Sequence, residues 1–295
     1  HKEYRRQRQM CIRDSCYNIF FNSIVNNGRN VLESRLHYED GVYSIDQEDL
    51  EEKLADPQTS MLILCNPHNP VGKIWDRETL ERIGELCFKH HVLVLSDEIH
   101  CDITRPGMEY IPFASASEHC KNNSITCVAP TKTFNLAGLQ TAAVIVPDAA
   151  LRHRVNRGLN TDEVAEPNVF AAIAPIAAFD RGREWLEELR EYLWENRKAA
   201  EDFIREEIPE LRTVSADATY LLWIDCNALP GDLSELAEFI RKESGLYVCD
   251  GREYGNGYGF LRMNLACRRE LLKEGLERLK RSIHSYRKGI SNGII

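Results

Sequence analysis

The apolar residues of this chain fall into short continuous runs separated by amphipathic stretches. Four runs are almost entirely apolar, as is typical of strands buried on both faces of a sheet, and they span residues 61–65, 92–95, 125–128 and 142–146. Residues 76–90, between the first two runs, carry apolar side chains at helical spacing. Buried strands that alternate with helices predict an α/β fold, in which a mostly parallel central sheet lies between two layers of helices.

After residue 147 the pattern becomes helical and then alternates again. Residues 168–179 are small and apolar, which suits tight packing, and residues 183–207 are typical of a long charged helix. Further strands and helices are predicted at residues 219–224, 232–242, 247–249, 260–265 and 268–287. We therefore predict a large domain over residues 17–182, a smaller C-terminal α/β domain over residues 183–288, and a tail at 289–295.

Residues 1–16 differ from the rest of the chain. They are basic and polar, without hydrophobic periodicity. We expect them to be a non-native or disordered leader and exclude them from the predicted fold. On this interpretation the chain is an N-terminally truncated fragment, whose large domain lacks its first part.

Composition and charge exclude several classes of function. The formal net charge of -9 disfavours a nucleic-acid or anionic-membrane partner, because these partners bind basic surfaces. No apolar run approaches the length of a membrane span. The ten cysteines are scattered and none forms a CxxC pair. We expect no metal site, and instead reduced thiols in a cytoplasmic protein.

Lys132 follows the apolar run at residues 125–128, where a lysine is costly to desolvate. Burial there would lower its pKa and make its amine a nucleophile able to form a Schiff base. Taken alone, such a lysine more often reaches solvent from a loop. Two other polar clusters strengthen the first interpretation, because ligands bind beyond the carboxyl ends of strands in open α/β sheets. These clusters are NPHNPVG at residues 66–72 and SDEIH at residues 96–100.

The order and spacing of these three clusters resemble the class I and II aminotransferase family of fold-type I pyridoxal 5'-phosphate enzymes. Five sequence motifs are similar to those of the cystathionine β-lyase-type branch of that family: NPHNPVG, SDEIH, TKTFNLAG, TYLLWID and GFLRMNLAC. The resemblance runs from Tyr17 to about Arg287. It implies a three-layer fold-type I large domain, a smaller C-terminal α/β domain, and pyridoxal phosphate as cofactor.

The resemblance also implies roles for individual residues. Lys132 would hold the cofactor as a Schiff base and then move the α-proton of the substrate. Asp97 would pair with the pyridine nitrogen and keep it protonated. Asn69 would donate to the phenolic oxygen, and His100 stands where many aminotransferases carry a tyrosine that contacts the same oxygen.

Three further residues complete the predicted site. Tyr17 would stack on the cofactor ring, although an ordinary core aromatic is an equally good interpretation. Arg262 lies in the apolar run FLRMNL and would bind the substrate α-carboxylate as a bidentate fork. Thr131 would supply a hydroxyl to the cofactor phosphate. The phosphate site departs from the family pattern, since Gln140 replaces an arginine and the family's phosphate loop is absent.

Several functions are compatible with these residues. The first is a carbon–sulfur β-lyase that acts on cystathionine or cysteine-like amino acids, and the alternative is an aminotransferase that uses the same residues. A non-catalytic protein of the same fold is a third possibility, which the presence of Lys132, Asp97 and Asn69 disfavours. A nicotinamide dehydrogenase is weaker, because no GxGxxG follows a strand. The family resemblance further implies a homodimer.

Overall fold

A computed structural model describes residues 9–13 and 16–292 of the chain. Its centre is a six-stranded sheet with the order β2-β1-β5-β6-β7-β8. Every neighbouring pair is parallel except β7 and β8, which confirms the predicted mostly parallel sheet. The strands are β1 (Gln9–Arg13), β2 (Asn30–Ser34), β5 (Thr59–Cys65), β6 (Leu93–Asp97), β7 (Ser124–Val128) and β8 (Ala143–Ile145).

Strand β1 corrects the prediction for the leader. Residues 9–13 pair in parallel with β2 on one side and β5 on the other. Cys11 and Ile12 are completely buried on opposite faces of the sheet. The basic composition of residues 1–16 hid a short strand, Met10-Cys11-Ile12, that is too brief to show periodicity. Residues 1–8 and 14–15 of the predicted leader lie outside the described residues.

Helices cover both faces of the large sheet, because alternate side chains of its strands point to opposite sides. On one face, Leu62 and Leu64 of β5 belong to the same core cluster as residues of α2 and α3. On the other face, Ile63 and Cys65 pack with Ile24 of α1. The helices before α9 are α1 (Asn18–Asn26), α2 (Gln47–Ala55), α3 (Arg77–Lys89), α4 (Phe113–Ala116), α5 (Glu118–Asn122), α6 (Pro130–Thr133), α7 (Ala149–Thr161) and α8 (Phe170–Arg181), with the 3-10 helix η1 (Ala137–Leu139).

A second, four-stranded sheet has the order β11-β12-β10-β9 and is antiparallel. Its strands are β9 (Arg212–Thr213), β10 (Leu221–Asp225), β11 (Cys249–Asp250) and β12 (Phe260–Asn264), and the hairpin β3 (Leu36–Glu39) and β4 (Val42–Ile45) forms a separate two-stranded sheet. The remaining helices are α9 (Arg183–Glu207), α10 (Leu236–Ser244) and α11 (Arg269–Ser291), with η2 (Leu233–Glu235) and η3 (Gly251–Tyr254).

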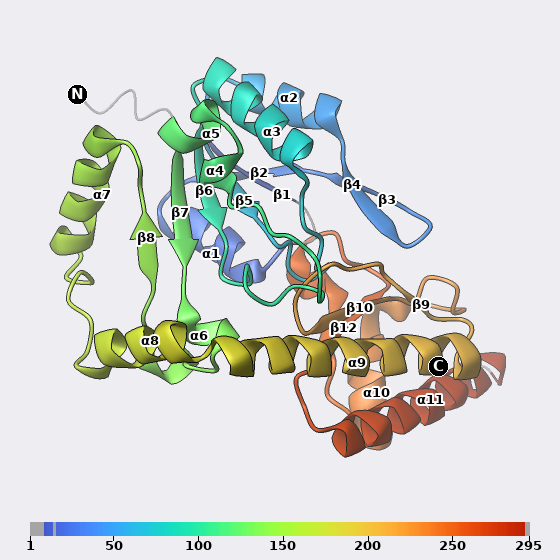
Figure 1. Ribbon diagram of the computed structural model, residues 1–295. Coiled ribbons are helices and arrows are strands. Elements are labelled where there is room, and N and C mark those ends of the chain that lie inside the picture. Colours follow the sequence, from blue (N-terminus) through green and yellow to red (C-terminus); the bar gives the residue numbers. More distant parts are fainter. Residues whose placement is uncertain (1–8, 14–15, 293–295) are drawn as a thin grey trace.

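Helix α9 links the two sheets and runs across the lower part of the structure in Figure 1, with α10 and α11 below its C-terminal half. It begins at Arg183, the residue at which the smaller domain was predicted to begin. Ala200 and Ile204 of α9 share a core with β10, α10 and α11. Helix α11 extends to Ser291, into the predicted tail. The division into domains itself stays a prediction.

Two predictions of burial are wrong. Strand β8 was predicted to be buried, but Val144 and Ile145 are 38% and 49% exposed. Helix α8 was predicted to pack tightly, yet Ala171 is its only buried residue, and Ile173 and Ile176 are more than 60% exposed. The sequence pattern shows where apolar side chains lie along the chain but does not show which surfaces cover them.

No helix of the described part of the chain is long and apolar enough to cross a membrane.

Candidate active site

Asn69 lies in the turn after β5, at the carboxyl end of the large sheet. The completely buried Asn66 holds this turn in place. Its Oδ1 accepts from the Trp75 backbone N–H at 3.3 Å, and its carbonyl accepts from the Tyr110 hydroxyl at 2.9 Å. Asn69 is itself 8% exposed. The turn therefore presents an amide side chain from a fixed and largely buried backbone.

Two neighbouring carboxylates end strand β6, and they have different surroundings. Glu98 is buried, and its Oε1 accepts from the Ser96 hydroxyl at 2.8 Å and from the Phe113 N–H at 3.0 Å. Asp97 accepts from the Ile99 N–H at 3.2 Å. Glu98 is thus used to hold the segment before α4, whereas most of the hydrogen-bonding capacity of Asp97 is left for a ligand.

Lys132 lies in α6, directly after β7. Helix α6 is tied to the loop after β6, because the Thr133 hydroxyl donates to Asp102 Oδ2 at 3.0 Å. The Lys132 side chain is exposed, contrary to the expectation of burial. It makes no hydrogen bond or ion pair with any residue that the structure describes. Its amine is therefore free to react with a carbonyl group.

Arg262 reaches the same place from β12 of the second sheet. Its Nη1 lies 3.5 Å from Asn69 Oδ1, and its Nη2 donates to Cys249 Sγ at 3.4 Å. The guanidinium carbon lies 4.6 Å from the centre of the Tyr254 ring. Within residues 9–13 and 16–292, no carboxylate forms an ion pair with Arg262. A partly buried cation without an anion is costly, and a bound carboxylate would remove that cost.

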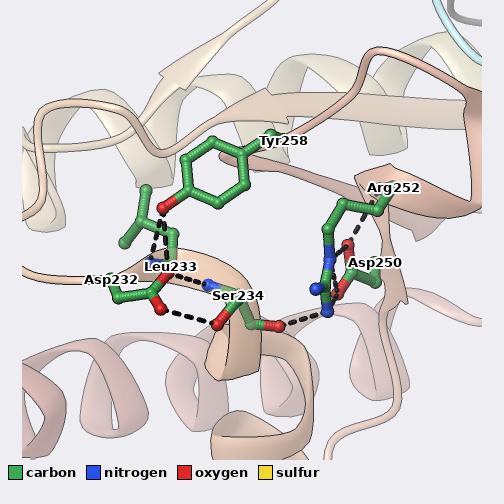
Figure 2. Close-up of polar contacts among 6 residues, drawn as sticks. All are labelled: Asp232, Leu233, Ser234, Asp250, Arg252 and Tyr258. Carbon is green, nitrogen blue, oxygen red and sulfur yellow. Dashed lines mark hydrogen bonds and ion pairs between the residues drawn. The ribbon is translucent and has the colours of Figure 1, made fainter.

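A polar network fixes the segment that carries Tyr254. Figure 2 shows Arg252 of η3 between Asp250 and Ser234. Its Nη2 donates to Asp250 Oδ2 at 2.7 Å and also to the Ser234 carbonyl. Tyr258 joins the same network by donating to Asp232 Oδ1 at 3.0 Å. These bonds tie η3, the short helix that ends at Tyr254, to η2 just before α10.

The charges of the site act on one another. Burial raises the pKa of Asp97, and the Ile99 N–H and the positive charge of Lys132 oppose that rise. Burial, together with the positive charges of Lys132 and Arg262, lowers the pKa of His100 to about 3. His100 is therefore neutral at physiological pH. Its buried Nδ1 has no hydrogen-bond partner among the described residues, and this leaves it available to a ligand.

The structure brings most of the predicted site residues together. Lys132, Asp97, His100, Asn69 and Arg262 are connected through the contacts and electrostatic interactions above. Their individual roles stay predictions.

The other predicted residues lie around this group. Tyr17 packs beside the aromatic cluster that contains Tyr254 and Trp223. Thr131 lines a cavity together with Lys132. Gln140 ends η1 in the left-handed region, with φ of 49°. The roles of Tyr17 and Thr131 stay predictions as well.

Three residues of the site were not predicted as such: Tyr220, Cys249 and Tyr254. The Tyr220 ring centre lies 5.6 Å from that of His100. Burial raises the pKa of the Tyr220 hydroxyl, and the positive charge of Arg262 opposes that rise. Cys249 pairs directly with Arg262 across β11 and β12. The predicted strands 247–249 and 260–265 contained this neighbour, but only their register identifies it.

A cavity of about 530 Å³ opens beside Lys132, between α6, α9 and the segment after β12. Thr131, Lys132 and Tyr220 lie on its wall, whereas Asp97, Asn69 and Arg262 do not line it. Its volume is in the range of small-molecule sites. We call it the Lys132 cavity.

The residues present fit pyridoxal phosphate at its aldehyde and ring. Lys132 is a free amine, Asp97 is a mostly buried carboxylate short of partners, and the His100 Nδ1 is unpaired. The phosphate end has a hydroxyl candidate in Thr131, while Gln140 brings no charge. Within the described part of the chain no three His, Cys, Asp or Glu side chains gather in a way that could hold a metal ion.

Comparison with known proteins gives the same family by an independent route. The profile of the family "Aminotransferase class I and II" matches residues 5–279. The chain is 41% identical to cystathionine beta-lyase PatB of Bacillus subtilis over 276 residues, which are 93% of this chain and 71% of that protein. It is 32% identical to protein MalY of Escherichia coli over 94% of this chain and 70% of that protein.

Solved structures give a similar result. A pyridoxal-phosphate-bound putative aminotransferase from Clostridium difficile superposes with a TM-score of 0.91 at 38% identity, covering 95% of this chain and 72% of that one. Cystalysin from Treponema denticola, which contains a pyridoxal 5'-phosphate cofactor, superposes with a TM-score of 0.92 at 31% identity, covering 95% and 71%.

Proposed function

We propose, because the chain belongs to the class I and II aminotransferase family, that it is a pyridoxal-phosphate-dependent carbon–sulfur β-lyase. Its substrates are cystathionine or related cysteine thioethers. With water, the reaction releases pyruvate, ammonia and a thiol by α,β-elimination. The relatives named cystathionine beta-lyase support this reaction over amino transfer.

One structural observation carries the proposal. Arg262, from the second sheet, presents a guanidinium that lacks an anion beside Asn69, His100 and Lys132 from the first sheet. A substrate carboxylate bound there in a bidentate fork would place its Cα next to the Lys132 amine. The site thus combines a carboxylate receptor and a base within one small region.

The residues of the site divide the chemistry between them. When bound, pyridoxal phosphate supplies the electron sink that makes the α-proton of an amino acid acidic. Asp97 would hold a proton on the ring nitrogen, and Asn69 and His100 would hold the phenolic oxygen. Lys132 would anchor the cofactor and act as the base that takes the α-proton of the substrate.

Other residues orient the reacting groups. Tyr17 would hold the cofactor ring, and the Thr131 hydroxyl would hold the phosphate. Arg262 would fix the carboxylate end of the substrate and so limit the orientations of its Cα–H and Cβ–S bonds. A sulfur leaving group departs easily as a thiolate, so elimination competes well with return of the proton.

Product analysis with L-cystathionine tests the proposal against the aminotransferase alternative. The protein loaded with pyridoxal phosphate should release pyruvate, ammonia and homocysteine, and Lys132→Ala should release none. Transamination of alanine or aspartate with a keto-acid acceptor should be much slower. Fast amino transfer without pyruvate from any sulfur amino acid would favour the aminotransferase.

We also propose that the protein works as a homodimer in the cytoplasm. Apolar side chains of α8 and the residue before it are exposed, with Val169 at 77% and Phe170 and Ile173 at 64%. Exposed apolar patches of this kind mark interaction surfaces. All ten cysteines are free thiols, which supports a reducing compartment.

A further inference from the structure

The Lys132 cavity has a composition that the roles assigned so far do not explain. Its walls include large apolar and aromatic side chains, among them Trp185 and Leu189 of α9 and Tyr220 before β10. Among the residues that the structure describes, Lys132 and Arg268 are the two cations that line it, and no aspartate or glutamate does. A cavity with apolar walls and positive charge without negative charge suits an apolar chain that ends in an anion.

Arg268 stands at a well-fixed position on this wall. It is the residue before α11, and the backbone that leads to it is held by Asn196 of α9. The Asn196 amide donates to the carbonyls of Leu265 and Cys267 at 2.9 and 3.0 Å. The Arg268 side chain makes no hydrogen bond or ion pair with the described residues. Hydrogen bonds therefore hold the backbone before Arg268, while the Arg268 guanidinium has no partner among the described residues.

Asn264 adds a neutral donor to the same wall. Its Oδ1 accepts from the Ala266 N–H at 2.7 Å, which turns its amide nitrogen to other partners. Once Lys132 holds the cofactor, Arg268 is the cation of the cavity that remains for a second negative group.

We propose that the Lys132 cavity binds the far end of the substrate side chain, and that its preferred ligands are L-cysteine thioethers whose side chain ends in a carboxylate. This inference rests on the proposed function. The methylene groups of the thioether contact Trp185, Leu189 and Tyr220, and the terminal carboxylate pairs with Arg268. Because none of the described residues that line the cavity is a carboxylate, an ammonium group at the far end, as in cystathionine, adds nothing to binding.

A matched pair of substrates tests the inference. S-(3-carboxypropyl)-L-cysteine and S-butyl-L-cysteine have side chains of the same length and differ in the terminal carboxylate. The parent should show a kcat/KM ratio of at least ten in favour of the carboxylate substrate. Arg268→Gln should lower this ratio about 10- to 100-fold, the scale of a charge-assisted hydrogen bond. Arg268→Lys should retain part of it.

Arg281 of α11 provides the matched control. It is exposed and lies outside the cavity, so Arg281→Gln should leave the ratio unchanged. Each ratio is measured within one protein, so it does not depend on the fraction that is folded. A second readout is calorimetric binding of both thioethers to Lys132→Ala, where Arg268→Gln should weaken only the carboxylate ligand.

The outcomes separate this inference from the proposed function. Pyruvate from both substrates, with equal ratios in the parent and Arg268→Gln, would overturn the role of Arg268 and leave the lyase intact. A parent that prefers S-butyl-L-cysteine would do the same. A parent that releases pyruvate from neither substrate would overturn the proposed function and this inference with it.

Discussion

At the scale of single residues, the site is defined by polar groups whose partners are incomplete. Arg262 is neighboured by an amide, a thiol and an aromatic ring, and not by an anion. Asp97 is mostly buried, and burial raises its pKa because the Ile99 N–H and the charge of Lys132 offset that effect only in part. Polar groups of this kind destabilise the protein when no ligand is bound, and a ligand that supplies the missing partners would explain why they are present.

Arg262→Lys should reduce activity although it retains the positive charge. Lysine cannot form the bidentate fork and cannot keep the planar contact with Tyr254. We expect kcat/KM with cysteine thioethers to fall, and the fall should correspond to a loss of about 2–4 kcal/mol of transition-state stabilisation. Steady-state kinetics at saturating cofactor measure this change, and equal kcat/KM for both proteins would exclude Arg262 as the carboxylate receptor.

His100 should make the protein less stable in acid. Its folded pKa of about 3 lies below its ordinary value of 6.5, so the unfolded chain binds a proton that the folded protein does not. The contribution of His100 to the free energy of unfolding is therefore complete above pH 6.5, and it is lost as the pH falls from 6.5 towards 3. In that window it should decrease the free energy of unfolding by about 1.4 kcal/mol per pH unit.

Urea unfolding of the cofactor-free protein between pH 7.5 and 5 measures this effect. His100→Asn lacks the titrating group, so its free energy of unfolding should fall less steeply with acid than that of the parent. Parallel curves for the two proteins would show that His100 is not held neutral.

At this scale the sequence predicted the residues whose chemistry is unusual for their place. Lys132, Asp97 and Asn69 follow apolar runs, and Arg262 lies inside one, so each was noticeable without a structure. Tyr254 and Cys249 were not, because a tyrosine and a cysteine near a strand are ordinary. Their position beside Arg262 depends on the register of β11 and β12 and on the Arg252 network.

At the scale of elements, long periodic segments were predicted well and edges were not. The helix predicted over residues 76–90 is α3, and the Asp76 side chain caps it by accepting from the Thr79 N–H. Strand β1 was missed because five residues with mixed polarity give no pattern. The exposure of β8 and α8 could not be read from their apolar sequences, since covering surfaces are a tertiary property.

The turn after β5 depends on a glycine. Gly72 has φ of 80°, and its carbonyl accepts from the N–H groups of Asp217 and Ala218. A Cβ there would lie 2.5 Å from the Ala218 carbonyl oxygen and 2.8 Å from Ala216 Cβ. Gly72→Ala should therefore lower the free energy of unfolding by about 2–4 kcal/mol, from backbone strain and steric overlap together.

Gly107 is the matched control for this prediction. It has φ of 79°, and a Cβ added to it would meet no atom within 4 Å. Gly107→Ala should lower stability by about 1 kcal/mol, through strain alone. Denaturant titration compares the two variants, and equal losses would show that the packing of Gly72 against residues 216–218 contributes nothing.

At the scale of the whole molecule, the site exists only where the two sheets meet. Asn69, Asp97 and Lys132 come from the first sheet, and Arg262 and Tyr220 come from the second. Several contacts join these parts. Among them, Arg190 of α9 donates to the Thr104 carbonyl at 3.1 Å, and Lys73 lies 3.6 Å from Asp217. The family resemblance predicted Asn69, Asp97, Lys132 and Arg262 as members of one site, but it did not predict Tyr220.

The proposed dimer makes a prediction about mass. Ile173 and Ile176 lie one turn apart on α8 and are 64% and 61% exposed. Sedimentation equilibrium should give the mass of two chains for the parent and one chain for the double variant Ile173→Glu, Ile176→Glu. Leu271→Glu, at an exposed leucine of α11, should remain dimeric. A monomeric parent at micromolar concentration would contradict the proposal.

The most direct test is to locate the cofactor chemically, because we propose that the residues at the carboxyl ends of β5, β6 and β7 form a pyridoxal phosphate site. Lys132 is the amine without a partner beside Asp97 and His100. Borohydride reduction of the protein loaded with pyridoxal phosphate, followed by peptide mapping, should find the pyridoxyl group on Lys132. A label on any other lysine, or none at all, would contradict it.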